Sequence, residues 1–146
     1  MPNKMSEKII SILMVEDDEV DIMNIRRAFK KNNVTNPLHV TNNGIEALEY
    51  LKETNETAPL KMPKIILLDL NMPKMGGIEF LCELRKNENL KTISVFVMTT
   101  SNEDKDKVEA FNLNVAGYIL KPLSMDQFMD VVSTLNSYWK LCEFPA

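Results

Sequence analysis

Carboxylate side chains stand directly after two of the apolar segments of this 146-residue chain. Glu16 and Asp17 follow the first apolar segment, and Asp69 follows the third. Carboxylates with no histidine or cysteine among them favour a hard divalent ion such as Mg²⁺, which completes its shell with water and phosphate oxygens. If the carboxylates meet, they repel one another, and one should have a raised pKa unless a cation lies among them. These residue types therefore indicate the binding of a cation and a phosphoryl group.

Two further apolar segments end at groups that suit a phosphoryl group. Thr99 and Thr100 follow the fourth segment, and Lys121 follows the fifth. A lysine ammonium group and a hydroxyl can both donate hydrogen bonds to phosphoryl oxygens. Ligands in open α/β sheets bind at the carboxyl ends of the strands, so all of these groups are expected at one edge of the sheet.

The elements that must position these groups alternate along the chain. Short runs that are almost wholly apolar predict strands buried on both faces. Stretches with apolar residues at helical spacing separate them, which predicts a parallel sheet with helices on both faces and right-handed crossovers. The fold class is therefore α/β and doubly wound. The expected strands cover residues 9–15, 38–40, 65–68, 95–98 and 118–120.

The helical stretches have recognisable starts and faces. Asn42-Asn43-Gly44 is a turn signal that can also cap the next helix, whose buried face is expected to hold Ile45, Leu48 and Leu51. Residues 53–63 are polar with two prolines and are expected to form a surface loop. Val108, Phe111 and Leu113 mark a helix before the fifth strand, and a long amphipathic helix is expected from about residue 124 to 141.

Composition bounds the function more weakly. The chain is 45% apolar and 26% charged with a net charge of −4, which predicts one globular domain over residues 1–146 and no general attraction to nucleic acid or anionic membranes. Cys82 and Cys142 match no metal-ligand spacing, and a reduced cytoplasm is the default setting for them. No signal peptide and no membrane-spanning run is predicted.

Each of these residues also has an ordinary structural interpretation. Asp69 alone is as easily a turn former, and residues 16–19 alone suit a solvated helix N-terminus. Thr99 could cap a helix, Lys121 could be a surface lysine, and His39 is more simply a strand residue than a ligand. Their expected location at one edge of one sheet favours the functional interpretation.

The motifs resemble those of the receiver domain of two-component response regulators, the CheY-like family. Asp69 is followed by Thr99 after 30 residues and by Lys121 after 52, as is typical of that family. The resemblance implies a flavodoxin-like five-stranded parallel sheet in the order 2-1-3-4-5. It covers a core of about residues 9–141 and leaves a short tail, 142–146. The matching segments are Val15-Glu16-Asp17, Leu67 to Pro73 with Gly76-Gly77, Met98-Thr99 and Gly117 to Pro122.

The resemblance also implies a role for each acidic residue. Asp69 would accept a phosphoryl group from a histidine kinase as a carboxylate nucleophile. Asp17 would bind Mg²⁺ directly and Glu16 through water. Asn71 would offer its backbone carbonyl to the metal.

The remaining implied roles belong to the fourth and fifth strands. Lys121 would pair with the phosphoryl oxygens, and Thr99 would hydrogen-bond one of them. The Lys121–Pro122 bond is expected to be cis, as in the family. Tyr118 would be the switch aromatic, turning inward as Thr99 moves toward the phosphate. The surface formed by the helix after the fourth strand, the fifth strand and the last helix would then change.

The resemblance implies protein partners. A sensor histidine kinase would be the donor, and a downstream target protein, a phosphotransfer protein or a homodimer through the switched surface would read the signal. Four features are similar to those of stand-alone regulators that include partners of bacterial phytochromes. They are the Glu16-Asp17 pair, a loop over residues 53–63 that is longer than in a minimal receiver, Thr99-Thr100-Ser101, and a tail with Trp139. Apolar side chains near the end could seal such an interface or pack on the domain itself. They are Tyr138, Trp139, Leu141 and Phe144.

Two other functions stay open at this point. A Mg²⁺-dependent phosphatase of the haloacid dehalogenase type also uses a strand-end aspartate and a lysine, but it needs a second aspartate where this chain has Asn71. A degenerate receiver would act only as a binding module, although the complete set of expected site residues argues against that.

Overall fold

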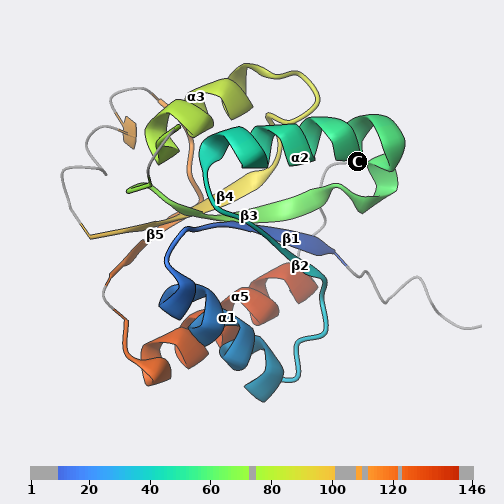
Figure 1. The fold of residues 1–146 in the computed structure, drawn as a ribbon. Coiled ribbons are helices and arrows are strands. Elements are labelled where there is room, and N and C mark those ends of the chain that lie inside the picture. Colours follow the sequence, from blue (N-terminus) through green and yellow to red (C-terminus); the bar gives the residue numbers. More distant parts are fainter. Residues whose placement is uncertain (1–9, 73–74, 101–107, 110–111, 122, 142–146) are drawn as a thin grey trace, which may run out of the picture.

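The computed structural model describes residues 10–72, 75–100, 108–109, 112–121 and 123–141. They form a five-stranded parallel sheet in the order β2-β1-β3-β4-β5, which confirms the predicted fold and strand order (Figure 1). The strands are β1 (Ser11–Val15), β2 (Leu38–Thr41), β3 (Pro63–Asp69), β4 (Ser94–Thr99) and β5 (Gly117–Leu120).

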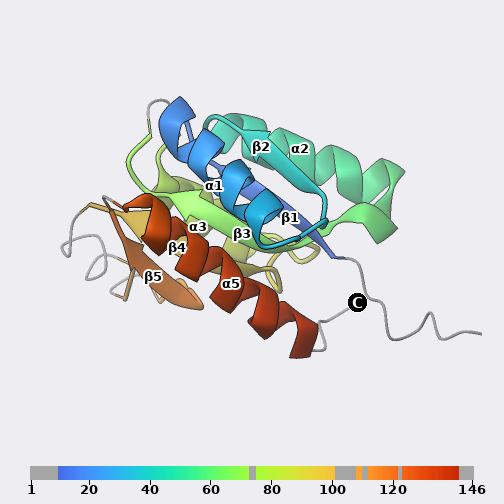
Figure 2. The same ribbon diagram turned by 90° about the horizontal axis from the view of Figure 1, so that it is seen from below.

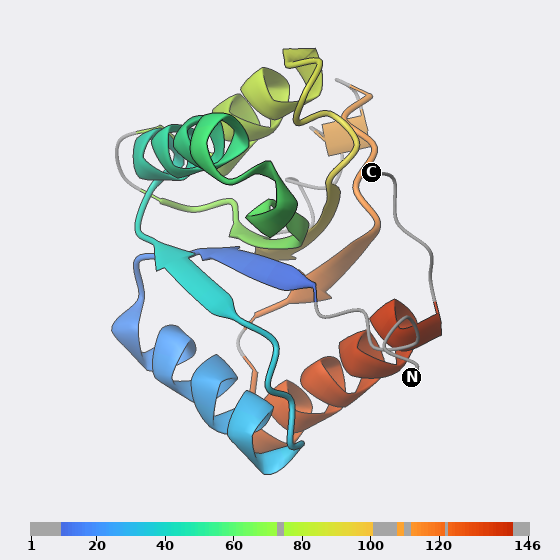
Figure 3. The same cartoon turned by 90° about the vertical axis from the view of Figure 1, so that its right-hand side faces the viewer.

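Helices cover both faces of the sheet. In Figure 1, α2 and α3 lie on one face, and α1 and α5 lie on the other. Figures 2 and 3 show α1 and α5 side by side on one face of the sheet, in front of the strands in Figure 2 and below them in Figure 3. No helix in the described ranges is both long and apolar enough to span a bilayer. The helices are α1 (Glu19–Lys31), α2 (Gly44–Thr57), the short 3₁₀ helix η2 (Pro59–Lys61), α3 (Gly77–Lys86) and α5 (Met125–Leu141).

The core consists of two layers because consecutive strand residues point to opposite faces. On β1, Leu13 and Val15 pack with the layer beneath α2 and α3, whereas Ile12 and Met14 pack with the layer beneath α1 and α5. Residues 65–68 of β3 are all buried, as expected for a strand covered on both sides. The edge strands β2 and β5 are instead only partly buried, so the expected burial on both faces holds for the inner strands and not for the edges.

The expected surface loop over residues 53–63 is wrong. Helix α2 continues through Thr57, and a turn of 3₁₀ helix follows before β3. Thr54 extends the buried face of α2, and the Thr57 hydroxyl donates to the Glu53 carbonyl at 2.8 Å. The helix ends only where Pro59, which has no N–H, cannot continue it. The polar composition did not predict the last turns of α2, because their buried residue is a threonine rather than an apolar residue.

The start of α2 agrees with the capping signal, but one face residue was misplaced. The Asn43 side chain accepts the N–H of Glu46 at 2.9 Å, so Asn43 caps the helix. Ile45 is 45% exposed, whereas Ala47, Leu48 and Leu51 are buried. Ile45 is exposed because it lies about 100° around the helix from Gly44, which begins the buried face.

The end of α5 packs mainly on its own domain. Trp139 is buried and its ring lies 6.3 Å from that of Phe29 on α1, while the Tyr138 ring meets Phe96 edge-on at 5.7 Å. Leu141 is 87% exposed. Phe144 lies outside the described residues, as does most of the helix expected before β5, of which Val108 and Glu109 are helical.

Two adjacent glycines at the start of α3 differ sharply in the space around them. A Cβ on Gly77 would lie 2.6 Å from the Leu70 Cα and 3.0 Å from the Asp69 carbonyl, whereas a Cβ on Gly76 would meet nothing within 4 Å. We expect Gly77→Ala to lower the free energy of unfolding by about 1–3 kcal/mol, because backbone must move. Gly76 has φ −72° and ψ 170°, which suits alanine, so Gly76→Ala should leave stability nearly unchanged. Urea denaturation measures both, and equal losses in the two variants would contradict this packing.

Candidate functional site

The end of β1 supplies two of the expected carboxylates. The Glu16 N–H donates to the Thr41 carbonyl at 2.9 Å, and this contact with β2 holds Glu16 at the sheet. Its carboxylate is fully buried, while Asp17 next to it is exposed. Asp18 then caps α1 by accepting backbone N–H groups. The acidic run therefore divides: Glu16 and Asp17 belong to the site, and the rest of it starts a helix.

The end of β3 places Asp69 beside Glu16, since β1 and β3 pair through Val15 and Leu68. Asp69 is 3% exposed, and its Oδ1 accepts the Asn71 N–H at 3.0 Å. Asp69 therefore stabilises the turn after β3 and is also part of the site. Carboxylate oxygens of Glu16, Asp17 and Asp69 lie within 4.8 Å of one another.

The end of β5 brings Lys121 into this cluster. Its N–H donates to the Thr99 carbonyl at 2.8 Å, which fixes the backbone at the neighbouring strand end. The Lys121 Nζ lies 2.8 Å from Glu16 Oε1 and 3.6 Å from Asp69 Oδ2. It also lies 2.8 Å from Asp21 Oδ2, on the first turn of α1. Asp21 was not among the predicted site residues, and no local pattern in the sequence indicated its contact with Lys121.

The electrostatics of the cluster follow from its burial. Burial raises the pKa of Glu16 to about 8; a hydrogen bond to Asp69 adds to the rise and Lys121 opposes it. Burial also disfavours the charged form of Lys121, but hydrogen bonds to Asp21 and Glu16 outweigh this and raise the Lys121 pKa. One carboxylate of the cluster therefore has a raised pKa although the Lys121 ammonium group lies beside it, because the effect of burial is larger than the attraction of the lysine.

The raised pKa of Glu16 makes stability depend on pH. Between its ordinary value of 4.5 and its folded value of about 8, the folded chain retains a proton that the unfolded chain has released. Without metal, the free energy of unfolding should therefore fall by about 1–3 kcal/mol as the pH rises through this window. Denaturation at several pH values measures this slope. Glu16→Gln should flatten it, Glu19→Gln in the exposed first turn of α1 should not, and an unchanged slope in Glu16→Gln would refute the assignment.

Thr99 and Asn71 lie beside this cluster, whereas Tyr118 pairs with Val97, two residues before the end of β4. Thr99 ends β4, is 2% exposed, and follows Met98, which pairs with Asp69. Asn71 is exposed, and its amide donates to the Thr100 hydroxyl at 3.4 Å. Tyr118 is half-buried on β5, and burial and then the charge of Glu109 raise its pKa. The expected cis bond involves Pro122, which lies outside the described residues.

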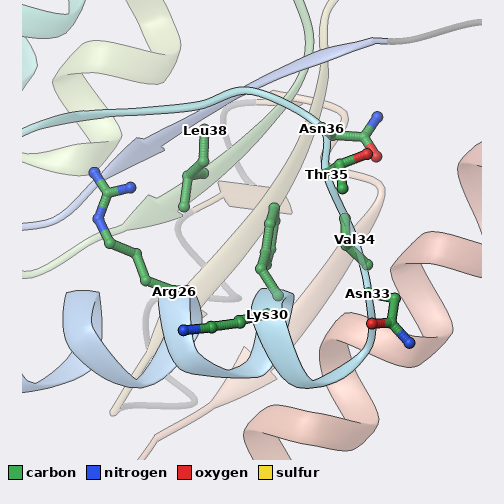
Figure 4. Close-up of a pocket in the computed structure, with 8 residues that line it drawn as sticks. Arg26, Lys30, Asn33, Val34, Thr35, Asn36 and Leu38 are labelled. Carbon is green, nitrogen blue, oxygen red and sulfur yellow. The ribbon is translucent and has the colours of Figure 1, made fainter.

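A separate hollow of about 450 Å³ lies toward the other end of α1 (Figure 4). Arg26 and Lys30 extend from the helix there, and Leu38 extends from β2. None of the expected site residues lines it. Its lining is Arg26, Phe29, Lys30, Asn33, Val34, Thr35, Asn36 and Leu38.

The donor chemistry of the strand-end cluster fits a small divalent cation. The three carboxylates provide only oxygen ligands, which are the ligands that Mg²⁺ and Mn²⁺ accept. A cation there would offset the repulsion between Glu16 and Asp69, which raises the Glu16 pKa. The site can therefore hold a metal beside one buried aspartate and one lysine.

The comparison with known protein families decides the kind of protein. The family of response regulator receiver domains matches residues 12–133, which include all of the expected site residues. This chain belongs to that family. The receiver domain is 37% identical to the probable methanogenesis regulatory protein FilR2 of Methanothrix harundinacea over 88% of this chain and 82% of that protein. It is 33% identical to the response regulator Rcp1 of Synechocystis over 88% of this chain and 87% of that protein.

Solved structures agree with this family. The phosphorylated cyanobacterial phytochrome response regulator RcpA matches the receiver domain with a TM-score of 0.81 and 33% identity, over 95% of this chain and all of that chain. The Mn²⁺-bound form of Rcp1 matches with a TM-score of 0.78 and 32% identity, over 94% of this chain and 99% of that chain. The receiver domain therefore has the receiver fold along nearly its whole length.

Proposed function

We propose that this receiver domain is the response regulator of a two-component phosphorelay and that Asp69 accepts the phosphoryl group in a Mg²⁺-dependent reaction. The observation that carries the proposal is the buried Asp69 carboxylate held among Glu16, Asp17 and Lys121 at the carboxyl edge of the sheet. The relative RcpA is phosphorylated in its crystal structure, which supports the same chemistry in this chain.

The transfer is a displacement at phosphorus. A carboxylate oxygen of Asp69 forms the new P–O bond, and the P–N bond to the kinase histidine breaks. The imidazole leaves with the electron pair and takes up a proton, and Asp69 becomes an acyl phosphate. Lys121 and the Thr99 hydroxyl donate hydrogen bonds to the phosphoryl oxygens, because both lie at strand ends next to Asp69.

The metal would be held by Asp17 and Asp69 directly, by Glu16 through water, and by the backbone carbonyl of Asn71. When bound, Mg²⁺ neutralises charge on the phosphoryl oxygens. The relative Rcp1 has a Mn²⁺-bound form, and Mn²⁺ takes the same oxygen ligands as Mg²⁺. The side chains of Glu16 and Lys121 are 0% and 10% exposed, whereas Asp17 is exposed, so the metal would lie at the solvent-facing side of the cluster.

The output passes through protein contacts. Phosphorylation adds roughly −1.5 to −2 charge units beside Thr99, which would draw the Thr99 hydroxyl toward the phosphate and turn Tyr118 inward. These movements would alter the face formed by the helix expected between β4 and β5, by β5 and by α5. A target protein, a phosphotransfer protein or a second copy of this chain would read that face. The similarity to the phytochrome response regulator RcpA favours a phytochrome-like histidine kinase as donor. The regulator would then act in the cytoplasm.

Incubation with acetyl phosphate tests the proposed function without the cognate kinase. We expect stoichiometric phosphorylation of the chain with Mg²⁺ and none with excess chelator, read by intact-protein mass. The bond that breaks in the donor is the P–O bond, and acetate leaves. Steady turnover of a phosphomonoester would favour the phosphatase instead. Failure to bind either Mg²⁺ or beryllofluoride would favour a degenerate receiver that only binds partners.

A further inference from the structure

One carboxylate at the site stands apart from the metal-binding cluster. Asp21 is the third residue of α1, and its N–H donates to the capping Asp18 side chain at 3.2 Å, so the helix start fixes its place. Asp21 Oδ2 lies 2.8 Å from Lys121 Nζ, and the two side chains are 18% and 10% exposed. Among the described residues, the grouped oxygens that could hold a metal belong to Glu16, Asp17 and Asp69.

The ammonium group of Lys121 is therefore shared unequally. It has three donors, and its Nζ lies 2.8 Å from both Glu16 and Asp21. Asp69 Oδ2 is 3.6 Å away, beyond the usual hydrogen-bond distance. The Lys121 ammonium group therefore lies closer to Glu16 and to Asp21 of α1 than to Asp69, the carboxylate that is to be phosphorylated.

We propose that Asp21 is a positioning residue that holds Lys121 toward α1 and competes with a phosphoryl group on Asp69 for this lysine. The inference rests on the proposed function. A phosphoryl group brings three acceptor oxygens and roughly −1.5 to −2 charge units, so Lys121 must shift toward it. The Asp21 carboxylate opposes this shift in two ways, because it binds the ammonium group and repels the incoming anion.

Removing the charge of Asp21 should strengthen binding of a phosphoryl group rather than weaken it. Glu16 still holds Lys121 at 2.8 Å, and the lysine side chain is nine-tenths buried, so the lysine stays at the site. What is lost is the competing carboxylate. Asp21 thereby links the start of α1 to the phosphorylation of Asp69, because the Asp21 carboxylate and the phosphoryl group bind the same lysine.

Calorimetric titration of the full chain with beryllofluoride, a phosphoryl mimic, in the presence of Mg²⁺ tests the competition. We expect Asp21→Asn to bind about 5- to 30-fold more tightly than the wild type. Asp21→Glu keeps the negative charge, so its affinity for beryllofluoride should stay close to that of the wild type. Glu19→Gln removes an exposed charge from the same turn and should stay within about twofold of the wild type, since solvent screens it.

A second readout concerns the protein without beryllofluoride. The side-chain nitrogen signal of Lys121, followed by NMR, should move in Asp21→Asn and keep its position in Glu19→Gln. An unmoved Lys121 signal in Asp21→Asn, equal or weaker beryllofluoride binding by that variant, or equal tightening in Glu19→Gln each overturns the inference. If the wild type binds no beryllofluoride at all, the proposed function fails too; if it binds and Asp21→Asn is no tighter, only the competition fails.

Discussion

Asp69→Asn is expected to lose phosphorylation by acetyl phosphate completely, down to the level seen with chelator. The substitution removes the nucleophilic oxygen and leaves an amide of nearly the same shape. The amide oxygen can still accept the Asn71 N–H, now 3.0 Å from Asp69 Oδ1, so the turn after β3 should survive. Intact-protein mass after incubation with Mg²⁺ and acetyl phosphate measures the loss.

The matched control is Asp18→Asn, which makes the same chemical change at an exposed carboxylate close to the end of β1. Asparagine also caps helices, so α1 should keep its start and phosphorylation should proceed as in the wild type. Undiminished phosphorylation of Asp69→Asn would contradict the acceptor assignment. A loss in both variants would show that the reaction depends on the general charge near the site rather than on Asp69.

Lys121→Met is expected to cost the most stability of any single change at the site. It leaves the buried carboxylates of Glu16 and Asp69 without the ammonium group that now lies 2.8 and 3.6 Å from them. Without metal at pH 8, the free energy of unfolding should fall by about 3–5 kcal/mol, as when one partner of a buried ion pair is removed. The loss should be smaller near pH 5, because Glu16, with a pKa of about 8, is then protonated and neutral. Urea denaturation at the two pH values measures it.

Lys91→Met gives the control for this change. Lys91 also pairs with a glutamate, Glu88, at 2.9 Å, but the two side chains are 46% and 81% exposed. A solvent-exposed pair contributes only about 0–1 kcal/mol, so Lys91→Met should be nearly neutral at both pH values. Equal and small effects of the two substitutions would contradict the view that Lys121 balances buried charge.

The sequence predicted those parts of the molecule that depend on local pattern. Residues 65–68 are wholly apolar because β3 is buried on both faces, and the abrupt change at Asp69 marks the end of the strand. The same rule located Glu16 and Lys121. The carboxyl ends of parallel strands lie at the same edge of the sheet, so residues that directly follow the strands were expected to lie close together.

The parts that were missed depend on tertiary packing. The last turns of α2 have a polar sequence, and Thr54 becomes a buried contact only through the placement of the helix on the sheet. The contact between Asp21 and Lys121 joins residues far apart in the sequence and depends on how α1 lies against the end of β5. No periodicity in the sequence contains that relation. The roles assigned to the site residues remain predictions on a geometry that brings most of those residues together.

The most direct measurement of the central claim is the location of the phosphoryl group. The chain is phosphorylated with acetyl phosphate and Mg²⁺, the acyl phosphate is reduced with borohydride, and the peptides are sequenced by mass spectrometry. Reduction converts a phosphorylated aspartate to homoserine, so the account predicts homoserine at Asp69 and unmodified residues at Glu16 and Asp17. Homoserine at another aspartate, or a phosphorylated chain that carries no homoserine at position 69, would contradict it.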